Sequence, residues 1–108
     1  MSRIIRPIPI ALDKPRLLIL DFNAVVAIEE KTGDNALSAA FWKNASPKRI
    51  RGALWGCLLH DKKDPITIEK VGDIIDSNLD RWEEITTALI EAWSEALPKK
   101  KEVETPAA

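Results

Sequence analysis

Two side chains with reactive chemistry, a thiol and an imidazole, lie three positions apart near the middle of this chain. Cys57 is the only cysteine and His60 is the only histidine. An imidazole beside a thiol can generate a nucleophilic thiolate, but a third group must orient the base, and the neighbouring sequence offers none. A structural zinc site needs four ligands, normally cysteine and histidine, and the chain supplies one of each. We therefore interpret Cys57 as a small core residue.

Acidic side chains could bind a hard metal ion if they were grouped correctly. Asp73, Asp76 and Asp80 are close in sequence, but this run lacks the glycine turn and the closing glutamate of a calcium-binding loop. A solvated helix face is the better interpretation. Asp61 and Asp64 are interpreted in the same way, as residues that cap and solubilise a loop. The sequence therefore predicts no metal site.

Motifs for phosphate binding and hydrolysis are missing from the sequence. It contains no glycine-rich phosphate loop, serine elbow or HExxH pattern, and its four glycines are isolated from one another. Carboxylates that the fold brings together remain the one catalytic arrangement that these patterns leave open. We predict that the protein is not an enzyme and binds no cofactor.

The tryptophans carry a sharper signal, because the chain has four of them. In the helix expected around residue 55, Trp55 and Leu59 form a stripe displaced by one residue from the main apolar face. Two interpretations stay open for Trp55: it lies in the core, or it is exposed as an interaction hot spot. We favour a protein-binding stripe, supported by nearby cations. The predicted partner-binding residues are Trp55, Leu59, Arg49, Arg51 and Lys48.

Charge and hydropathy narrow the choice of partner. The 108 residues carry a net charge of -1, which gives no electrostatic reason to bind nucleic acid or anionic lipid. No apolar run approaches the roughly 20 residues that span a bilayer. Pro7, Pro9 and Asp13 also interrupt the N-terminal apolar stretch that a signal peptide would need. We expect a cytoplasmic protein with neither a membrane nor a nucleic-acid partner.

The expected fold class is α+β, mostly α: a short N-terminal β-hairpin followed by about five helices. Residues 4–12 and 16–20 are the expected strands. Pro7 and Pro9 each remove a hydrogen-bond donor, so the first segment should lie at an edge or stay irregular. The apolar run 17–20 is expected to be buried continuously. One domain should span residues 1–97, and residues 98–108 have too few apolar side chains to pack, which predicts a disordered tail.

Helix boundaries follow from capping residues and glycine or proline stops. The expected helices are 22–32 after Asp21, 35–43 with an Asn35 cap, 47–60 after Ser46, 68–76 after Thr67, and 79–97 after Asn78. In the first of these helices, Phe22, Val25 and Val26 are expected to share one face. Gly52 and Gly56, four positions apart in the third, are expected to let another helix approach closely.

A helix-turn-helix motif is one alternative, because residues 67–75 resemble the first helix of such motifs. The next helix would then read DNA. It opens with Asp80, Glu83 and Glu84 against a single arginine, and phosphates would repel that segment. A small DNA-binding or regulatory protein is therefore the weaker hypothesis.

The order and spacing of several segments resemble the small tail assembly chaperones of long-tailed phages and the related proteins of gene transfer agents. The matching segments are LDFNA at 20–24, IEEKTG at 28–33, IRGALWGCLLHD at 50–61, TIEKVGDII at 67–75, and a long helix over 79–97. Residues 2–9, with two prolines, depart from the usual pattern and leave the hairpin less certain.

The resemblance implies a non-enzymatic protein of a phage or prophage that acts in the cytoplasm of the bacterial host. Such a chaperone binds the long helical tape measure protein and keeps it soluble while tail tube protein assembles around it. Self-association is compatible with this role. A structural tail component that is retained in the virion is a further alternative, because it differs only in its fate.

Overall fold

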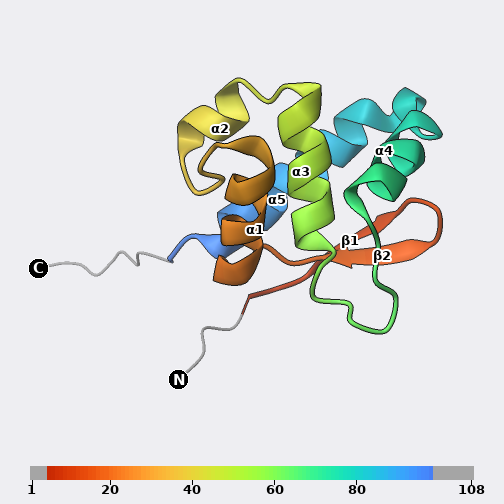
Figure 1. Ribbon diagram of the computed structural model, residues 1–108, viewed down its shortest axis with the longest axis horizontal. Coiled ribbons are helices and arrows are strands. Elements are labelled where there is room, and N and C mark those ends of the chain that lie inside the picture. The colour runs from red at the N-terminus through yellow and green to blue at the C-terminus, as the bar shows by residue number, and fades with distance from the viewer. Residues whose placement is uncertain (1–4, 99–108) are drawn as a thin grey trace, which may run out of the picture.

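A hairpin packed against a group of helices makes up the part of the chain that the computed structural model describes, residues 5–98 (Figure 1). The elements are β1 Ile8–Ala11, β2 Pro15–Leu18, α1 Phe22–Thr32, α2 Ala39–Lys43, α3 Pro47–Cys57, α4 Ile68–Asp76, the 3-10 turn η1 Leu79–Arg81, and α5 Trp82–Ala96. The predicted class, α+β and mostly α, is confirmed. The tail predicted over residues 98–108 lies outside the described residues except for Pro98.

The hairpin is antiparallel and pairs Ile8 with Leu18 and Ile10 with Arg16. Ile8, Ile10 and Leu18 are buried, whereas Leu17 is 49% exposed. The predicted continuous burial of residues 17–20 is therefore wrong, because neighbouring side chains of a strand point to opposite faces and only one face of this hairpin packs against the helices. Both strands are edges of the sheet, which suits the missing donor of Pro9.

Helix α3 is the central element, and it contacts α1, α4, α5 and β2. In Figure 1 it stands between α1 and α4, with α5 behind it. The main apolar face of this segment consists of Ile50, Leu54, Cys57 and Leu58, and all four side chains are buried. The helix ends at Cys57, three residues earlier than predicted, and continues as a series of turns through residue 60.

Two glycines of α3 explain how closely α1 packs on it. A Cβ placed on Gly52 would lie 2.6 Å from Thr32 Cγ2, and one placed on Gly56 would lie 2.7 Å from Ile28 Cδ1. Real Cβ atoms do not approach other atoms so closely, so these positions need glycine for the helices to meet. The expectation that another helix approaches at these glycines is confirmed, and that helix is α1.

The contact with α3 also decides which side of α1 is buried. The buried residues of α1 are Ala24, Val25, Ile28 and Thr32. The predicted face, with Phe22 and Val26, is wrong in part: Phe22 is 66% exposed and Val26 is 39% exposed. The spacing of apolar residues in α1 is compatible with burial of either the face with Phe22 and Val26 or the face with Ile28 and Thr32. The second face is buried because Ile28 and Thr32 pack against Gly56 and Gly52 of α3.

Two other helix starts differ from the prediction. The second helix begins after Ser38, whose hydroxyl accepts from the Ala40 amide, and Asn35 instead closes a turn by accepting from the Leu37 amide at 2.9 Å. Asn78 makes no side-chain cap, and the residues after it form η1 before α5 begins. This change at the start of the last helix matters for the surface described next.

Candidate protein-docking surface

Trp55, the residue predicted to anchor a partner, is held from two sides by the protein itself. Its Nε1 donates to the carbonyl oxygen of Ile66 at 3.2 Å, which fastens the loop between α3 and α4. The Lys31 ammonium lies 5.5 Å from the centre of the indole ring, within the range of a cation–π contact. The side chain is half-buried. Trp55 is thus both a packing residue and part of the surface.

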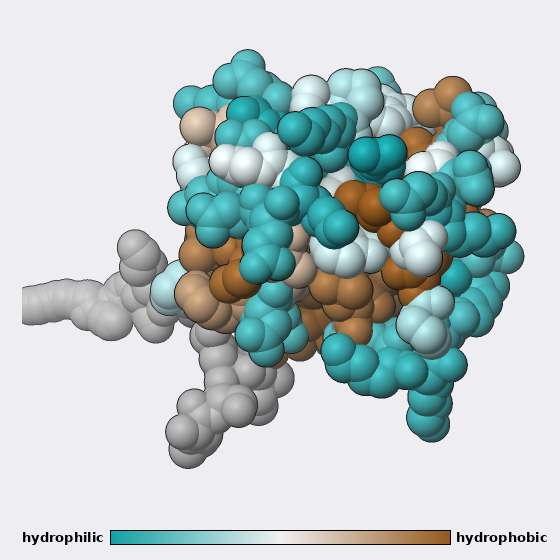
Figure 2. Space-filling model, viewed as in Figure 1, coloured by the Kyte–Doolittle hydropathy of each residue, from teal (hydrophilic) through white to brown (hydrophobic). Residues whose placement is uncertain are grey.

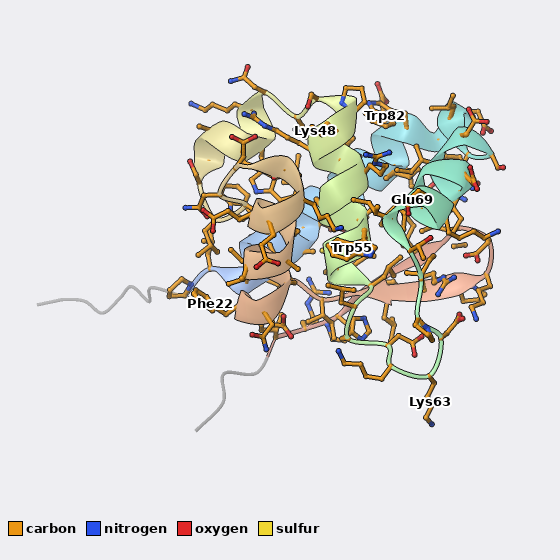
Figure 3. The ribbon with its side chains drawn as sticks, viewed as in Figure 1. Phe22, Lys48, Trp55, Lys63, Glu69 and Trp82 are labelled. Carbon is orange, nitrogen blue, oxygen red and sulfur yellow. The ribbon has the colours of Figure 1, made fainter. Side chains whose placement is uncertain are left out.

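Leu59 lies in the turns after α3, and it is half-buried like Trp55. Pro47, Arg51 and Trp55 are four positions apart and form a natural ridge of α3. Leu59 comes four positions after Trp55, just beyond the end of the helix. This row runs along the side of α3 that α4 covers in part. Figure 3 shows Trp55 near the end of α3, with Glu69 of α4 beside it.

Arg49 has internal partners that fix its position. Its Nε donates to Asp34 at 3.0 Å and its Nη1 to the Asn44 carbonyl oxygen at 3.0 Å, and the guanidinium lies 5.5 Å from the Phe41 ring. These contacts join the start of α3 to the segments on either side of α2. Arg49 therefore has a structural role, and its role in partner binding stays a prediction.

A groove opens at the other end of the ridge, where α3, α4 and α5 meet. It has a volume of about 370 Å³, and its lining residues are Pro47, Arg51, Gly72, Ile75, Asp76, Leu79 and Trp82. The groove is largely apolar. Leu79 is 55% exposed, and the Trp82 side chain is half-buried. An apolar groove with exposed leucine and tryptophan is a typical docking surface for a protein segment.

The absence of a side chain at Gly72 lets α3 and α4 lie close at this groove. A Cβ placed on Gly72 would lie 3.3 Å from Cδ of Arg51, so the aliphatic stem of Arg51 crosses α4 there. We call the whole strip, from the groove along the ridge to Trp55 and Leu59, the α3–α4 seam. Trp82 and Trp55 mark its two ends in Figure 3, and Figure 2 shows apolar surface between charged side chains on this face.

The seam contains Trp55, Leu59 and Arg51 of the predicted set, but not Lys48, which is exposed in the first turn of α3 without lining the groove. Leu79 and Trp82 were not predicted as surface residues, because the sequence repeats Leu79, Trp82, Ile85 and Leu89 at spacings of three and four, the pattern of the buried face of a helix over 79–97. That spacing assumed one continuous helix. The tight turn η1 instead leaves Leu79 in the open groove, and the apolar spacing gave no sign of this turn.

The reactive side chains considered at the start are placed for packing. Burial, helped by the negative charge of Asp21, raises the pKa of the Cys57 thiol to about 12, so the thiol stays protonated at neutral pH. His60 Nε2 lies 2.7 Å from the Leu17 carbonyl oxygen at the edge of β2. Among residues 5–98, no three histidine, cysteine or acidic side chains are grouped closely enough to hold a metal ion.

Over the described residues, none of the helices has the length and apolar character needed to cross a bilayer.

Similar proteins give no direct evidence of function. No protein-family model matches the chain, and no curated protein or solved structure does so either.

Proposed function

We propose that this protein is a tail assembly chaperone of a phage, prophage or gene transfer agent, and that it binds an amphipathic helical segment of the tape measure protein along the α3–α4 seam. The observation that carries this proposal is the apolar groove in which Leu79 is 55% exposed. The order of segments that resembles the chaperones supports the same assignment, since two of those segments, 50–61 and 67–75, cover most of α3 and α4.

The seam suits a helix better than an extended peptide. A bound strand would need free backbone groups at a sheet edge, and those along β2 are already used in part. The amide of Ile19, the residue after β2, donates to the Cys57 carbonyl oxygen at 3.1 Å, and His60 Nε2 lies 2.7 Å from the Leu17 carbonyl oxygen. Two helices with a groove between them instead accept the apolar stripe of a third helix. Tape measure proteins of the resembled family are long helices with such stripes.

The wider assignment follows from this binding mode. By covering apolar helical surface, the protein keeps the tape measure protein soluble in the bacterial cytoplasm until tail tube protein assembles around it. In this role it is not an enzyme, and it leaves before the particle is complete. Mass spectrometry of purified particles distinguishes this fate from that of a retained tail component, which would be present in every particle.

Co-expression with a candidate tape measure protein tests the proposal. The chaperone should increase the soluble fraction of that long protein. Leu79→Ser should weaken binding about five- to tenfold, because roughly half of a leucine side chain is still available for burial by the partner. Phe22→Ser is the matched control, since Phe22 is even more exposed, at 66%, but lies at the start of α1 away from the groove.

The combination of outcomes decides the assignment. Both variants should stay folded, as judged by circular dichroism, because both side chains are more than half exposed. Equal loss of solubilisation in both variants would mean that the groove is not the binding site. If the unmodified protein leaves the tape measure protein insoluble, the chaperone assignment itself is wrong.

A further inference from the structure

We propose that the indole N–H of Trp82 selects the partner helix, because that helix must supply an uncharged oxygen acceptor to it. The other three tryptophans donate their indole N–H to a backbone carbonyl oxygen of the protein itself. These pairs are Trp42 with Ala36 at 2.8 Å, Trp93 with Leu37 at 3.1 Å, and Trp55 with Ile66 at 3.2 Å. No residue in the described part of the chain accepts from Trp82 Nε1. Water is therefore its acceptor in the free protein.

A partner that fills the groove changes the surroundings of this N–H. Trp82 lines the groove together with Ile75 and Leu79, and its side chain is half-buried before any partner binds. A bound helix, about 10 Å wide with its side chains, is broader than the indole ring and takes the place of water around it. An N–H group that loses water without gaining another acceptor weakens binding. The best partner therefore carries an acceptor for Trp82.

The acceptor is expected to be a side chain of the partner. In a continuous helix, each backbone carbonyl oxygen already accepts from the amide four residues later. A carboxylate is costly to bury in a largely apolar groove. The lining holds one cation, Arg51, and one anion, Asp76, so it has no net charge that would favour a charged acceptor. We expect glutamine, asparagine, serine or threonine at one position of the partner's apolar stripe.

This inference rests on the proposed docking of a helix in the groove, and it adds what that helix must carry. Hydrogen exchange of the full-length protein without a partner gives the first test. In NMR spectra each tryptophan contributes one indole N–H signal, and Trp82→Phe identifies the signal of Trp82. That signal should exchange with deuterium faster than the other three, whose N–H groups are hydrogen-bonded within the protein.

Peptide binding gives the second test. The probe is a labelled peptide of about 18 residues, roughly five helical turns, with a leucine stripe. Each stripe leucine in turn is replaced by glutamine in one series and by methionine, which has a similar length, in another. At one stripe position, the ratio of glutamine to methionine affinity should be about three- to tenfold higher for the parent protein than for Trp82→Phe, as expected for one neutral hydrogen bond.

Leu79→Ala is the matched control for Trp82→Phe. It removes apolar surface from the same groove but no hydrogen-bond donor. This variant should weaken the binding of every peptide and leave the ratio of glutamine to methionine affinity unchanged. A change in the ratio as large as that in Trp82→Phe would show that groove packing, not the indole N–H, reads the acceptor.

The remaining outcomes separate this inference from the proposed function. If the Trp82 indole exchanges as slowly as the other three, or the affinity ratio is the same in Trp82→Phe at every position, the acceptor rule is wrong and helix docking still stands. If no peptide binds, helix docking in the groove is wrong, and the proposed function loses its site. A dimer that Leu79→Ser dissociates would show that a second copy occupies the groove, which also overturns the inference.

Discussion

Two helical glycines, Gly56 in the last turn of α3 and Gly72 in the middle of α4, should respond in opposite ways to the same substitution by alanine. In a helix interior, glycine to alanine stabilises the folded state by about 1 kcal/mol through backbone entropy. The new methyl group must also fit its surroundings. The structure therefore predicts the sign of each change from the atoms that a Cβ would meet.

At Gly56 the new methyl group has no room. It would lie 2.7 Å from Ile28 Cδ1 and 3.3 Å from the Ala24 carbonyl oxygen, and Ile28 is fully buried. Overpacking of this kind costs about 1–3 kcal/mol and exceeds the gain in helix propensity at most sites. We expect Gly56→Ala to lower the free energy of unfolding by about 1 kcal/mol or more. The α1–α3 contact would have to open to accept it.

At Gly72 the nearest atom is Cδ of Arg51, 3.3 Å away, in the middle of a flexible and exposed side chain. This side chain can move aside at little cost, so the gain in helix propensity remains. Gly72→Ala should raise the free energy of unfolding by up to about 1 kcal/mol. It is the matched control for Gly56→Ala, because the chemical change is identical.

Urea unfolding followed by tryptophan fluorescence measures both effects. The midpoint should fall for Gly56→Ala and rise for Gly72→Ala, with similar slopes in both cases. A double-mutant cycle with Ile28→Ala adds a test of the cause: the double variant should lose less stability than the sum of the single losses. Shifts of the same sign for both glycines, or strict additivity with Ile28, would refute the steric explanation.

Three further predictions concern other parts of the molecule. Trp55→Phe removes the donor to the Ile66 carbonyl oxygen and should cost about 1 kcal/mol; limited proteolysis should then cut the loop between α3 and α4 faster than in the parent protein, and an unchanged rate would contradict this role of the indole. The hydrogen bond from Arg16 lowers the pKa of Asp13, and the one from Lys14 lowers the pKa of Asp64. A carboxyl group with a lowered pKa stabilises the folded state at pH values above its unfolded pKa, near 4, and this stabilisation is lost as the pH falls toward the lowered pKa. In urea titrations, Arg16→Gln should therefore lower the free energy of unfolding at pH 7 and make this free energy decline less between pH 5 and pH 2. Parallel pH profiles of the variant and the parent protein would contradict this prediction. Because burial raises the Cys57 pKa to about 12, an aromatic disulfide reagent at pH 8 should label the thiol only in denaturant, and rapid labelling of the folded protein would show that α3 opens readily.

Local sequence signals predicted the helix boundaries best where a cap contacts a residue three or four positions away. The Asp21 carboxylate accepts from the Ala24 amide at 2.9 Å, and Gly33 ends α1 with a φ of 80°, as its position after the apolar pattern predicted. Thr67 and Ser46 cap their helices in the same way. Asn78 does not cap α5, because the residues that follow it form η1 and α5 begins only after this turn.

The candidate site could be predicted only in part, because exposure depends on neighbours that are distant in sequence. Trp55 was correctly set apart from the main stripe of α3, and it is half-buried. Its hydrogen bond to Ile66, 11 positions away, has no local signal. The same holds for Arg49, whose ion pair with Asp34 spans 15 positions.

The sequence by itself determined the fold class, most helix boundaries and the close approach at Gly52 and Gly56, because these depend on caps, periodicity and missing side chains within single helices. Only the tertiary structure decided that Phe22 is exposed, that Arg49 is used internally and that Leu79 opens a groove between α3, α4 and α5. The physical reason is that an apolar side chain is buried only if another element covers it, and the covering element is chosen by packing across the whole chain.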